Sequence, residues 1–215
     1  MIPAPMHQRR FAGQTIKCFG RDQDGLVDYR FNHLGWRCDH DHYDVTGSVI
    51  AIGNSVTFGV GVDSAQRWTG LLEQHLGQPV YNFSVGHLTH SNLFYLQIID
   101  EILKHGAPKK IILQINNLDR VEHHGRWDEA AIWNLNEKYI MDQFHGYWSQ
   151  IKEYQKVCDF MFIYWDDKHH VLPRDLVDKL TINNLRRLDD ALTTVPDTFG
   201  PKSQQLIFTA IKNQL

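Results

Sequence analysis

Small and polar residues follow three of the apolar segments that the sequence predicts to be buried strands. Gly53-Asn54-Ser55 follows the first, Gly86 comes shortly after the second, and Asn116-Asn117 follows the third. A nucleophilic serine needs an exposed hydroxyl, a base that takes its proton, and hydrogen-bond donors for the developing oxyanion. Ser55 could provide the hydroxyl, Gly86 an unobstructed backbone N–H, and Asn116 or Asn117 a side-chain amide. The alternative interpretation is ordinary turn chemistry, for which Gly, Asn and Ser are common.

A fourth polar cluster follows a fourth apolar segment, and it contains two acids and two histidines: Asp166, Asp167, His169 and His170. In open parallel α/β sheets, ligands bind beyond the carboxyl ends of the strands. Because the four clusters all follow strand candidates, we expect them to converge on one edge of a sheet.

The elements that must position these residues alternate along the chain. Short apolar runs predict strands at 48–52, 79–83, 109–115 and 159–165. Helical spacing predicts helices at 67–77, 91–106, 174–194 and 200–215. It predicts one long helix or two at 128–158, with Gly146 as the expected break. Continuous rather than alternating apolar strands suit burial on both faces. The pattern predicts an α/β fold with layers of helices around a mainly parallel sheet. Residues 1–47 have poor periodicity, and we expect an irregular segment packed on a single domain that spans 1–215.

Composition excludes several function classes. The chain has 215 residues and a formal net charge of −3, and no run rich in Lys and Arg suggests nucleic-acid binding. No apolar run approaches the length of a membrane span, and the N-terminus has no apolar signal region. The three cysteines are far apart, which indicates neither a disulfide framework nor a zinc site. We therefore expect a cytoplasmic protein without a cofactor.

Two further features admit a functional interpretation. The run "CDHDHYD", Cys38 to Asp44, could ligate a divalent ion if it were extended, but a solvated polar loop is the simpler interpretation, and we predict no metal site. An aromatic stripe between Trp127 and Trp148 is expected to lie mostly in a helix core. One or two of its rings, if exposed, could stack on a sugar.

The motifs around these residues resemble the SGNH (GDSL-type) hydrolases. "AIGNSVTFGVGV" is similar to the first block of that family, Gly-Asp-Ser-x-Thr-x-Gly, and "YRFNHLGWR" is similar to a segment that precedes this block in many members. "VYNFSVGHLTHSN" and "IILQINNLDR" stand where the second and third blocks belong. "TFGPKSQQLIFTAI" resembles the segment that follows the catalytic Asp-x-x-His. The order and spacing match over about residues 29–213.

The resemblance implies a flavodoxin-like three-layer α/β sandwich and a serine ester hydrolase. Ser55 would be the nucleophile, and the oxyanion would be held by the backbone N–H groups of Ser55 and Gly86 and by the side-chain amide of Asn116. Gap-free spacing from Asn82 could place His87 instead of Gly86 in the second block. The implied substrate is a small acyl ester or an acylated glycan.

Three departures from the family pattern bear on catalysis. Asn54 replaces the first-block Asp, and Gln114 and Asn117 replace the Gly and Asp of the third block. In the last block, Thr198 stands where the family has its catalytic histidine and Val195 where it has its aspartate. A neutral imidazole is the general base of the family, and threonine cannot take that role at pH 7.

Two hypotheses follow from the missing histidine. Another histidine could supply the base, and the candidates lie after the predicted strands: His87, His90, His123, His124, His169 and His170. Alternatively, the protein is a degraded SGNH-like protein that binds a carbohydrate or a protein partner. An unrelated nucleotide-binding α/β domain is disfavoured because the chain has neither a Gly-x-Gly-x-x-Gly nor a P-loop motif.

Overall fold

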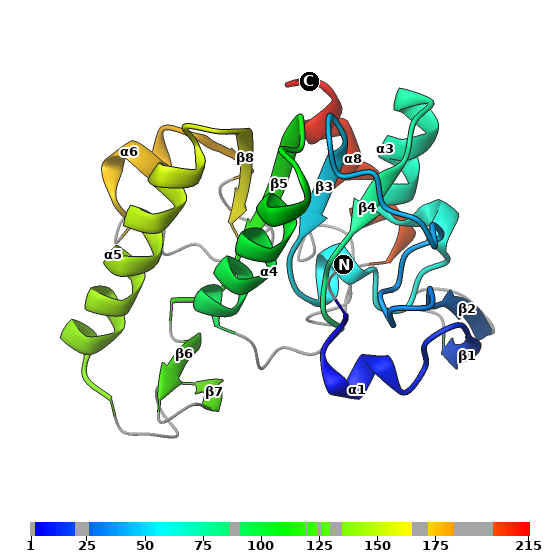
Figure 1. Cartoon of the computed structure of the whole chain (residues 1–215), viewed down its shortest axis with the longest axis horizontal. Coiled ribbons are helices and arrows are strands. Elements are labelled where there is room, and N and C mark those ends of the chain that lie inside the picture. Colours follow the sequence, from blue (N-terminus) through cyan, green and yellow to red (C-terminus); the bar gives the residue numbers. More distant parts are fainter. Residues whose placement is uncertain are drawn as a thin grey trace.

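A parallel sheet forms the centre of the molecule. The computed structural model describes residues 3–19, 26–86, 91–118, 120–123, 126–129, 135–164, 172–182 and 200–215. Among them, five strands pair in parallel in the order β4-β3-β5-β8-β9 (Figure 1). Their bounds are β3 (Val49–Ile52), β4 (Val80–Asn82), β5 (Lys110–Ile115), β8 (Asp159–Tyr164) and β9 (Leu180–Ile182). The predicted α/β fold with a mainly parallel sheet is confirmed.

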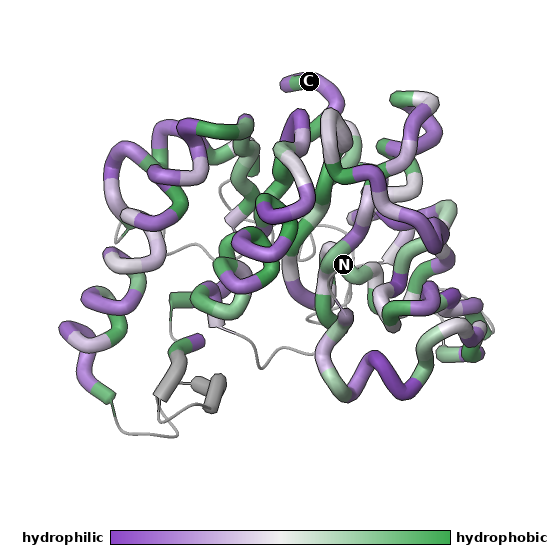
Figure 2. Tube along the Cα trace, viewed as in Figure 1, coloured by the Kyte–Doolittle hydropathy of each residue, from purple (hydrophilic) through white to green (hydrophobic). Residues whose placement is uncertain are grey.

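Helices cover both faces of this sheet. One face packs against α4 (Asn92–His105) and α5 (Glu137–Tyr154), and the other against α3 (Trp68–Leu76) and α8 (Pro201–Lys212). Successive strand residues serve opposite layers: Ile50 and Ile52 join the first cluster, whereas Val49 and Ala51 join the second. The central strands are accordingly hydrophobic along their length, while the helices alternate between hydrophobic and hydrophilic residues (Figure 2). The result is a three-layer sandwich.

The N-terminal segment has more regular structure than its sequence predicts. It contains a short helix, α1 (Met6–Arg9), and an antiparallel pair, β1 (Thr15–Phe19) and β2 (Leu26–Arg30). In β2 alternate residues are buried, and Val27 and Tyr29 pack with Phe58 of α2 (Ser55–Phe58) in a small cluster of their own. The expectation of an irregular segment is therefore wrong for these stretches, because half-buried strands mixed with polar residues are hard to detect by periodicity.

Two helix predictions also need correction. The stretch 128–158 begins as a strand: β7 (Arg126–Glu129) pairs antiparallel with β6 (Arg120–His123), and α5 then runs through Gly146 without a break. The stretch 174–194 was expected to be largely helical, but only α6 (Arg174–Val177) is helical in its described part, and β9 follows. Residues 183–194 lie outside the described residues. Pairing with β8 determines the conformation of β9, and no local pattern reports that pairing.

The remaining described elements are short. A 3₁₀ turn, η1 (Ser64–Gln66), precedes α3.

The described helices include none that is both long and apolar enough to cross a membrane. The three cysteines are free thiols, and burial raises the pKa of Cys158 to about 11.

Gly146 and Gly77 offer a matched test of the helix assignments. A Cβ added at either position meets nothing within 4 Å, but Gly77 ends α3 with a φ of +63° whereas Gly146 lies inside α5. We expect Gly146→Ala to raise the free energy of unfolding by about 1 kcal/mol, because Ala favours helix over Gly. Gly77→Ala should lower it by about 1 kcal/mol, because its φ is left-handed. Urea unfolding of both variants measures the difference, and stabilisation at residue 77 would contradict the assigned helix end.

Candidate active site

Ser55 lies just beyond the end of β3, an inner strand of the sheet. Gly53 and Asn54 follow the strand, Asn54 caps α2 by accepting a hydrogen bond from Val56 N, and Ser55 is the first residue of this four-residue helix. Ser55 is half-buried, whereas the other three residues of α2 are buried. Within the described part of the chain, no hydrogen bond involves Ser55 Oγ. The hydroxyl is therefore neither sealed in the core nor held by a described side chain.

Asn116, just beyond the end of β5, is linked to the residue beside Ser55. Asn54 Nδ2 donates to Asn116 Oδ1 at 2.8 Å. The backbone of Asn116 is held by Asn92, whose Oδ1 accepts from Asn116 N at 2.7 Å and whose Nδ2 donates to Asn116 O at 3.3 Å. Two of the three predicted site residues, Ser55 and Asn116, therefore lie at the same edge of the sheet.

Gly86 lies at this edge as well. Val85 N donates to Gly53 O at 3.0 Å, which extends the pairing of β4 and β3 up to the glycine. A Cβ at Gly86 would come within 3.2 Å of the Phe58 ring, so the Gly86 backbone lies directly against α2. The structure thus brings the backbone of Gly86 close to the turn that carries Ser55.

The backbone carbonyl groups of this turn accept hydrogen bonds from side chains to which the sequence analysis assigns no such role. Asn82 Nδ2 donates to Thr57 O at 2.9 Å. From α8, Gln204 Nε2 donates to Val56 O at 3.1 Å, and Gln204 Oε1 accepts from Trp68 N at 2.8 Å. Gln204 stands where the resembling family often has a second histidine, and it is fully buried. The only sequence signal for these contacts is the occurrence of amide residues within apolar strands and helices.

Arg37 holds the loop that follows α2. Its guanidinium is fully buried and donates to the backbone oxygens of Phe58, Gly59 and Val62, with a distance of 2.8 Å to Phe58 O. Its Cζ lies 3.5 Å from the centroid of the Tyr29 ring. Burial, followed by the nearby Arg67 cation, lowers the pKa of Arg37 well below its ordinary value. The carbonyl oxygens and the ring face oppose this cost of burying a cation.

These contacts explain the segment "YRFNHLGWR" in physical terms. Tyr29 Oη accepts from Gly61 N, and Asn32 Oδ1 accepts from Leu34 N and Trp36 N at 3.0 Å each. Asn32 thereby stabilises the turn that precedes Arg37 and positions Arg37 against the loop after α2. Gly59 has a φ of +75°, and a Cβ there would come within 2.3 Å of Arg67 Cγ. Both the conformation and the close approach of Arg67 exclude a side chain at residue 59.

The acidic and histidine side chains of residues 38–44 contact different partners instead of one another. His40 Nε2 lies 2.7 Å from Glu73 Oε2, and Asp39 Oδ2 lies 3.4 Å from Arg67 Nη2. The backbone N–H of His33 lowers the pKa of Asp41. In the ranges that the structure describes, no group of three or more His, Cys, Asp or Glu side chains is arranged to hold a metal ion.

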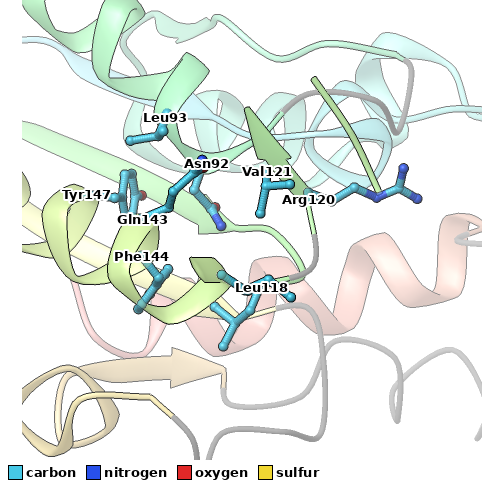
Figure 3. Close-up of a pocket in the computed structure, with 9 residues that line it drawn as sticks. Asn92, Leu93, Leu118, Arg120, Val121, Gln143, Phe144 and Tyr147 are labelled. Atoms are coloured by element: carbon cyan, nitrogen blue, oxygen red, sulfur yellow. The ribbon is translucent and has the colours of Figure 1, made fainter. Parts of the chain in front are cut away.

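A pocket lies beside Asn92, between α4, β6 and α5 (Figure 3). It is lined by Asn92, Leu93, Leu118, Arg120, Val121, Ile140, Gln143, Phe144 and Tyr147. Arg120 extends away from Tyr147 in this view (Figure 3). Tyr147 Oη is buried and has no hydrogen-bond partner in the described ranges, and burial raises the pKa of Tyr147 well above its usual value. The pocket is therefore lined by Tyr147, whose hydroxyl is neutral, and by Asn92, the residue that holds the backbone of Asn116.

The residues predicted to supply the base fall outside the described ranges. These are the histidines His87, His90, His124, His169 and His170. Asp166, Asp167 and the last-block residues Val195 and Thr198 also lie outside the described ranges. His123 belongs to β6, but its side chain is not described. Of the predicted site residues, the structure describes Ser55, Gly86 and Asn116.

The chain matches no protein-family model and no curated protein in sequence, but it matches solved structures in fold. TesA shares 10% identity at a TM-score of 0.50, with 78% of this chain and 97% of TesA covered. A protein from Desulfitobacterium hafniense DCB-2, described as lipolytic and of the G-D-S-L family, shares 12% identity at 0.51, with 79% and 100% covered. The psychrotrophic esterase EstA from Pseudoalteromonas sp., inhibited by monoethylphosphonate, shares 14% identity at 0.50, with 78% and 95% covered. At these identities the likeness shows the fold.

Arg37 provides a test of how the turn after Ser55 is held. Arg37→Met removes the donors of three buried carbonyl groups, and we expect the free energy of unfolding to fall by about 3 kcal/mol or more. Arg30→Met is the control, because Arg30 is 52% exposed and its pair with Asp41 spans 3.5 Å. Loss of such an exposed pair costs about 0–1 kcal/mol. Equal effects of the two substitutions in urea unfolding would contradict the role of Arg37.

Proposed function

We propose that this chain, which has the fold of the G-D-S-L lipolytic proteins, is a serine ester hydrolase with Ser55 as its nucleophile. The observation that carries the proposal is the position of Ser55. Ser55 is half-buried and follows the inner strand β3, and the carboxamide of Asn116 is hydrogen-bonded to the adjacent Asn54. The edge where parallel strands end is the usual ligand site of such sheets.

In the proposed reaction, Ser55 Oγ attacks the carbonyl carbon of the ester while a base takes its proton. The new C–O bond converts the carbonyl oxygen into an oxyanion, which the N–H groups of Ser55 and Gly86 and the amide of Asn116 stabilise. Collapse of this intermediate breaks the original ester bond, and the departing alkoxide receives the proton. Water then attacks the acyl-enzyme and releases the acid. Each oxyanion donor contributes a factor of about 10²–10³ to kcat.

The base in this scheme is one of the histidines predicted from the sequence. His87 and His90 follow the glycine loop, and His169 and His170 follow β8, whose carboxyl end lies at the same edge of the sheet. A base needs only to lie within hydrogen-bond reach of Ser55 Oγ, directly or through one water. The half-exposed position of Ser55 leaves room for such a partner.

The proposed substrate is a small acyl ester or an acylated glycan. The fold neighbour EstA is an esterase inhibited by a phosphonate.

A binding protein that has lost hydrolysis is the second candidate. The observation that favours it is the sequence of the last block, where Thr198 stands in place of histidine and no histidine follows His170. The buried supports of the turn would still shape a ligand site, but Ser55 would lack a base.

Ser55→Ala tests the first candidate. We expect the protein to hydrolyse a short-chain aryl ester and to gain one phosphonyl group from a serine-directed phosphonate, and the substitution should abolish both because it removes the nucleophile. Ser149→Ala is the control, since Ser149 is exposed on α5, and it should behave like the unaltered protein. Hydrolysis that survives Ser55→Ala would refute the site assignment, and inactivity of the unaltered protein would favour the binding protein.

Thr198→His tests the second candidate. If only the base is missing, restoring histidine at the family position should create or raise aryl-ester hydrolysis by about 10²-fold or more, the usual contribution of a general base. The gain should require Ser55 and should appear as the pH rises through the range in which imidazole loses its proton. No gain in a folded variant would show that the missing histidine does not by itself explain inactivity.

A further inference from the structure

The backbone N–H and the hydroxyl of Thr57 in α2 fix the orientation of the buried Gln114 side-chain amide. Thr57 N donates to Gln114 Oε1 at 3.3 Å, and Thr57 Oγ1 donates to the same oxygen at 2.6 Å. A backbone N–H can only donate, so the atom of Gln114 that faces Thr57 must be the oxygen. The Nε2 group of Gln114 therefore points to its other neighbour, Asn54.

The same reasoning fixes the orientation of the Asn54 side-chain amide. Its Oδ1 accepts from Val56 N at 3.1 Å and from Gln114 Nε2 at 2.6 Å. With the oxygen committed to these donors, Asn54 Nδ2 is the atom that faces Asn116, and it donates to Asn116 Oδ1 at 2.8 Å. The hydrogen bonds of these three amides, which we call the relay, all run in one direction. Thr57 N donates to Gln114, Gln114 donates to Asn54, and Asn54 donates to Asn116.

The relay is buried and anchored at its far end. Gln114 is 0% exposed, Asn54 1% and Asn116 3%. Asn92 holds the backbone of Asn116 from both sides. Since Asn116 Oδ1 faces Asn54, the Nδ2 group of the same amide points away from Asn54. Reversal of any one amide would place two donors or two acceptors face to face, at a cost of about 1–3 kcal/mol per buried unsatisfied group.

We propose that Asn54 and Gln114 are positioning residues that turn the N–H groups of Asn116 toward the oxyanion. This inference rests on the proposed function. Both residues are departures from the resembling motifs, which have Asp and Gly at these positions, and the hydrogen bond between them makes the two departures fit each other. Gly53 completes the arrangement, because a Cβ there would come within 2.7 Å of Gln114 Oε1.

Aspartate at residue 54 would disrupt the relay at one defined point. One carboxylate oxygen can still accept from Val56 and Gln114, but the other would face Asn116 Oδ1 as a second acceptor. The Asn116 amide can relieve this contact by turning over, so that its Nδ2 donates to the carboxylate. Its oxygen then takes the place of the donor and repels the developing oxyanion.

Asn54→Asp is therefore the variant that tests the proposal. We expect kcat for the aryl ester to fall by about 10²-fold or more, the cost of one oxyanion donor. KM should stay within about twofold, because the lost interaction is made only in the transition state. Asn136→Asp is the matched control: Asn136 caps α5 at an exposed position, where Asp is equally suitable. Its kcat should not change.

Gln114→Glu is a second variant. It keeps the acceptor for Thr57 but sets a second oxygen against Asn54 Oδ1, and it should also lower kcat by about 10²-fold or more if it folds. Gln97→Glu, exposed on α4, is its control. An unchanged kcat in folded Asn54→Asp, or a rise in KM alone, would overturn the positioning role.

A spectroscopic measurement separates failure of the relay from failure of the proposed function. The side-chain amide cross-peaks of Asn116 are identified in a ¹H–¹⁵N spectrum by their loss in Asn116→Asp. In Asn54→Asp they should shift downfield, because the Asn116 amide then donates to a carboxylate, and in Asn136→Asp they should not move. If the unaltered protein has no esterase activity, the proposed function fails, but the shift still supports the orientation. Cross-peaks that do not move in Asn54→Asp would overturn the relay whether or not the protein is an enzyme.

Discussion

The structure depends on one constraint: the irregular turn after β3 is buried, so its backbone polar groups need partners from elsewhere in the chain. An unpaired buried N–H or C=O group costs as much as a lost hydrogen bond. The turn and its loop bury Asn54, Val56, Thr57, Phe58 and Val62 almost completely. Their N–H and C=O groups bond side chains from four distant segments: Arg37, Asn82, Gln114 and Gln204. Sheet, N-terminal segment and last helix therefore meet at this turn.

The same constraint fixes the groups to which the proposed reaction assigns roles. Ser55 is half-exposed while its neighbours on both sides are fixed by hydrogen bonds, so its position is set without a contact to its hydroxyl in the described part of the chain. Asn116 is fixed through its backbone by Asn92 and through its oxygen by Asn54. Groups that are fixed before the substrate arrives stabilise charge with little reorganisation, which is the main requirement of an oxyanion site.

Strong local patterns made much of this fold predictable from the sequence. The runs that became β3, β5 and β8 are mainly apolar without a polar alternation, and α3 and α4 have clear spacing with Gly77 and Gly106 at their ends. Predictions were wrong where long-range contacts decide. Gly146 suggested a break, yet α5 continues because Tyr147 and Trp148 beside it are buried in the core. Ser55, Gly86 and Asn116 could be placed at one edge from topology, but the partners of Arg37 and Gln114 are far away in the sequence and have no periodic signal.

The most direct measurement of the central claim is a crystal structure of the protein after reaction with a serine-directed phosphonate, whose tetrahedral phosphorus stands in for the tetrahedral carbon of the intermediate. The account predicts a covalent bond from phosphorus to Ser55 Oγ, with one phosphonyl oxygen within hydrogen-bond distance of Asn116 Nδ2 and Gly86 N, about 2.7–3.1 Å. Phosphorus bound to a different residue, or a phosphonyl oxygen that faces Asn116 Oδ1, would contradict it.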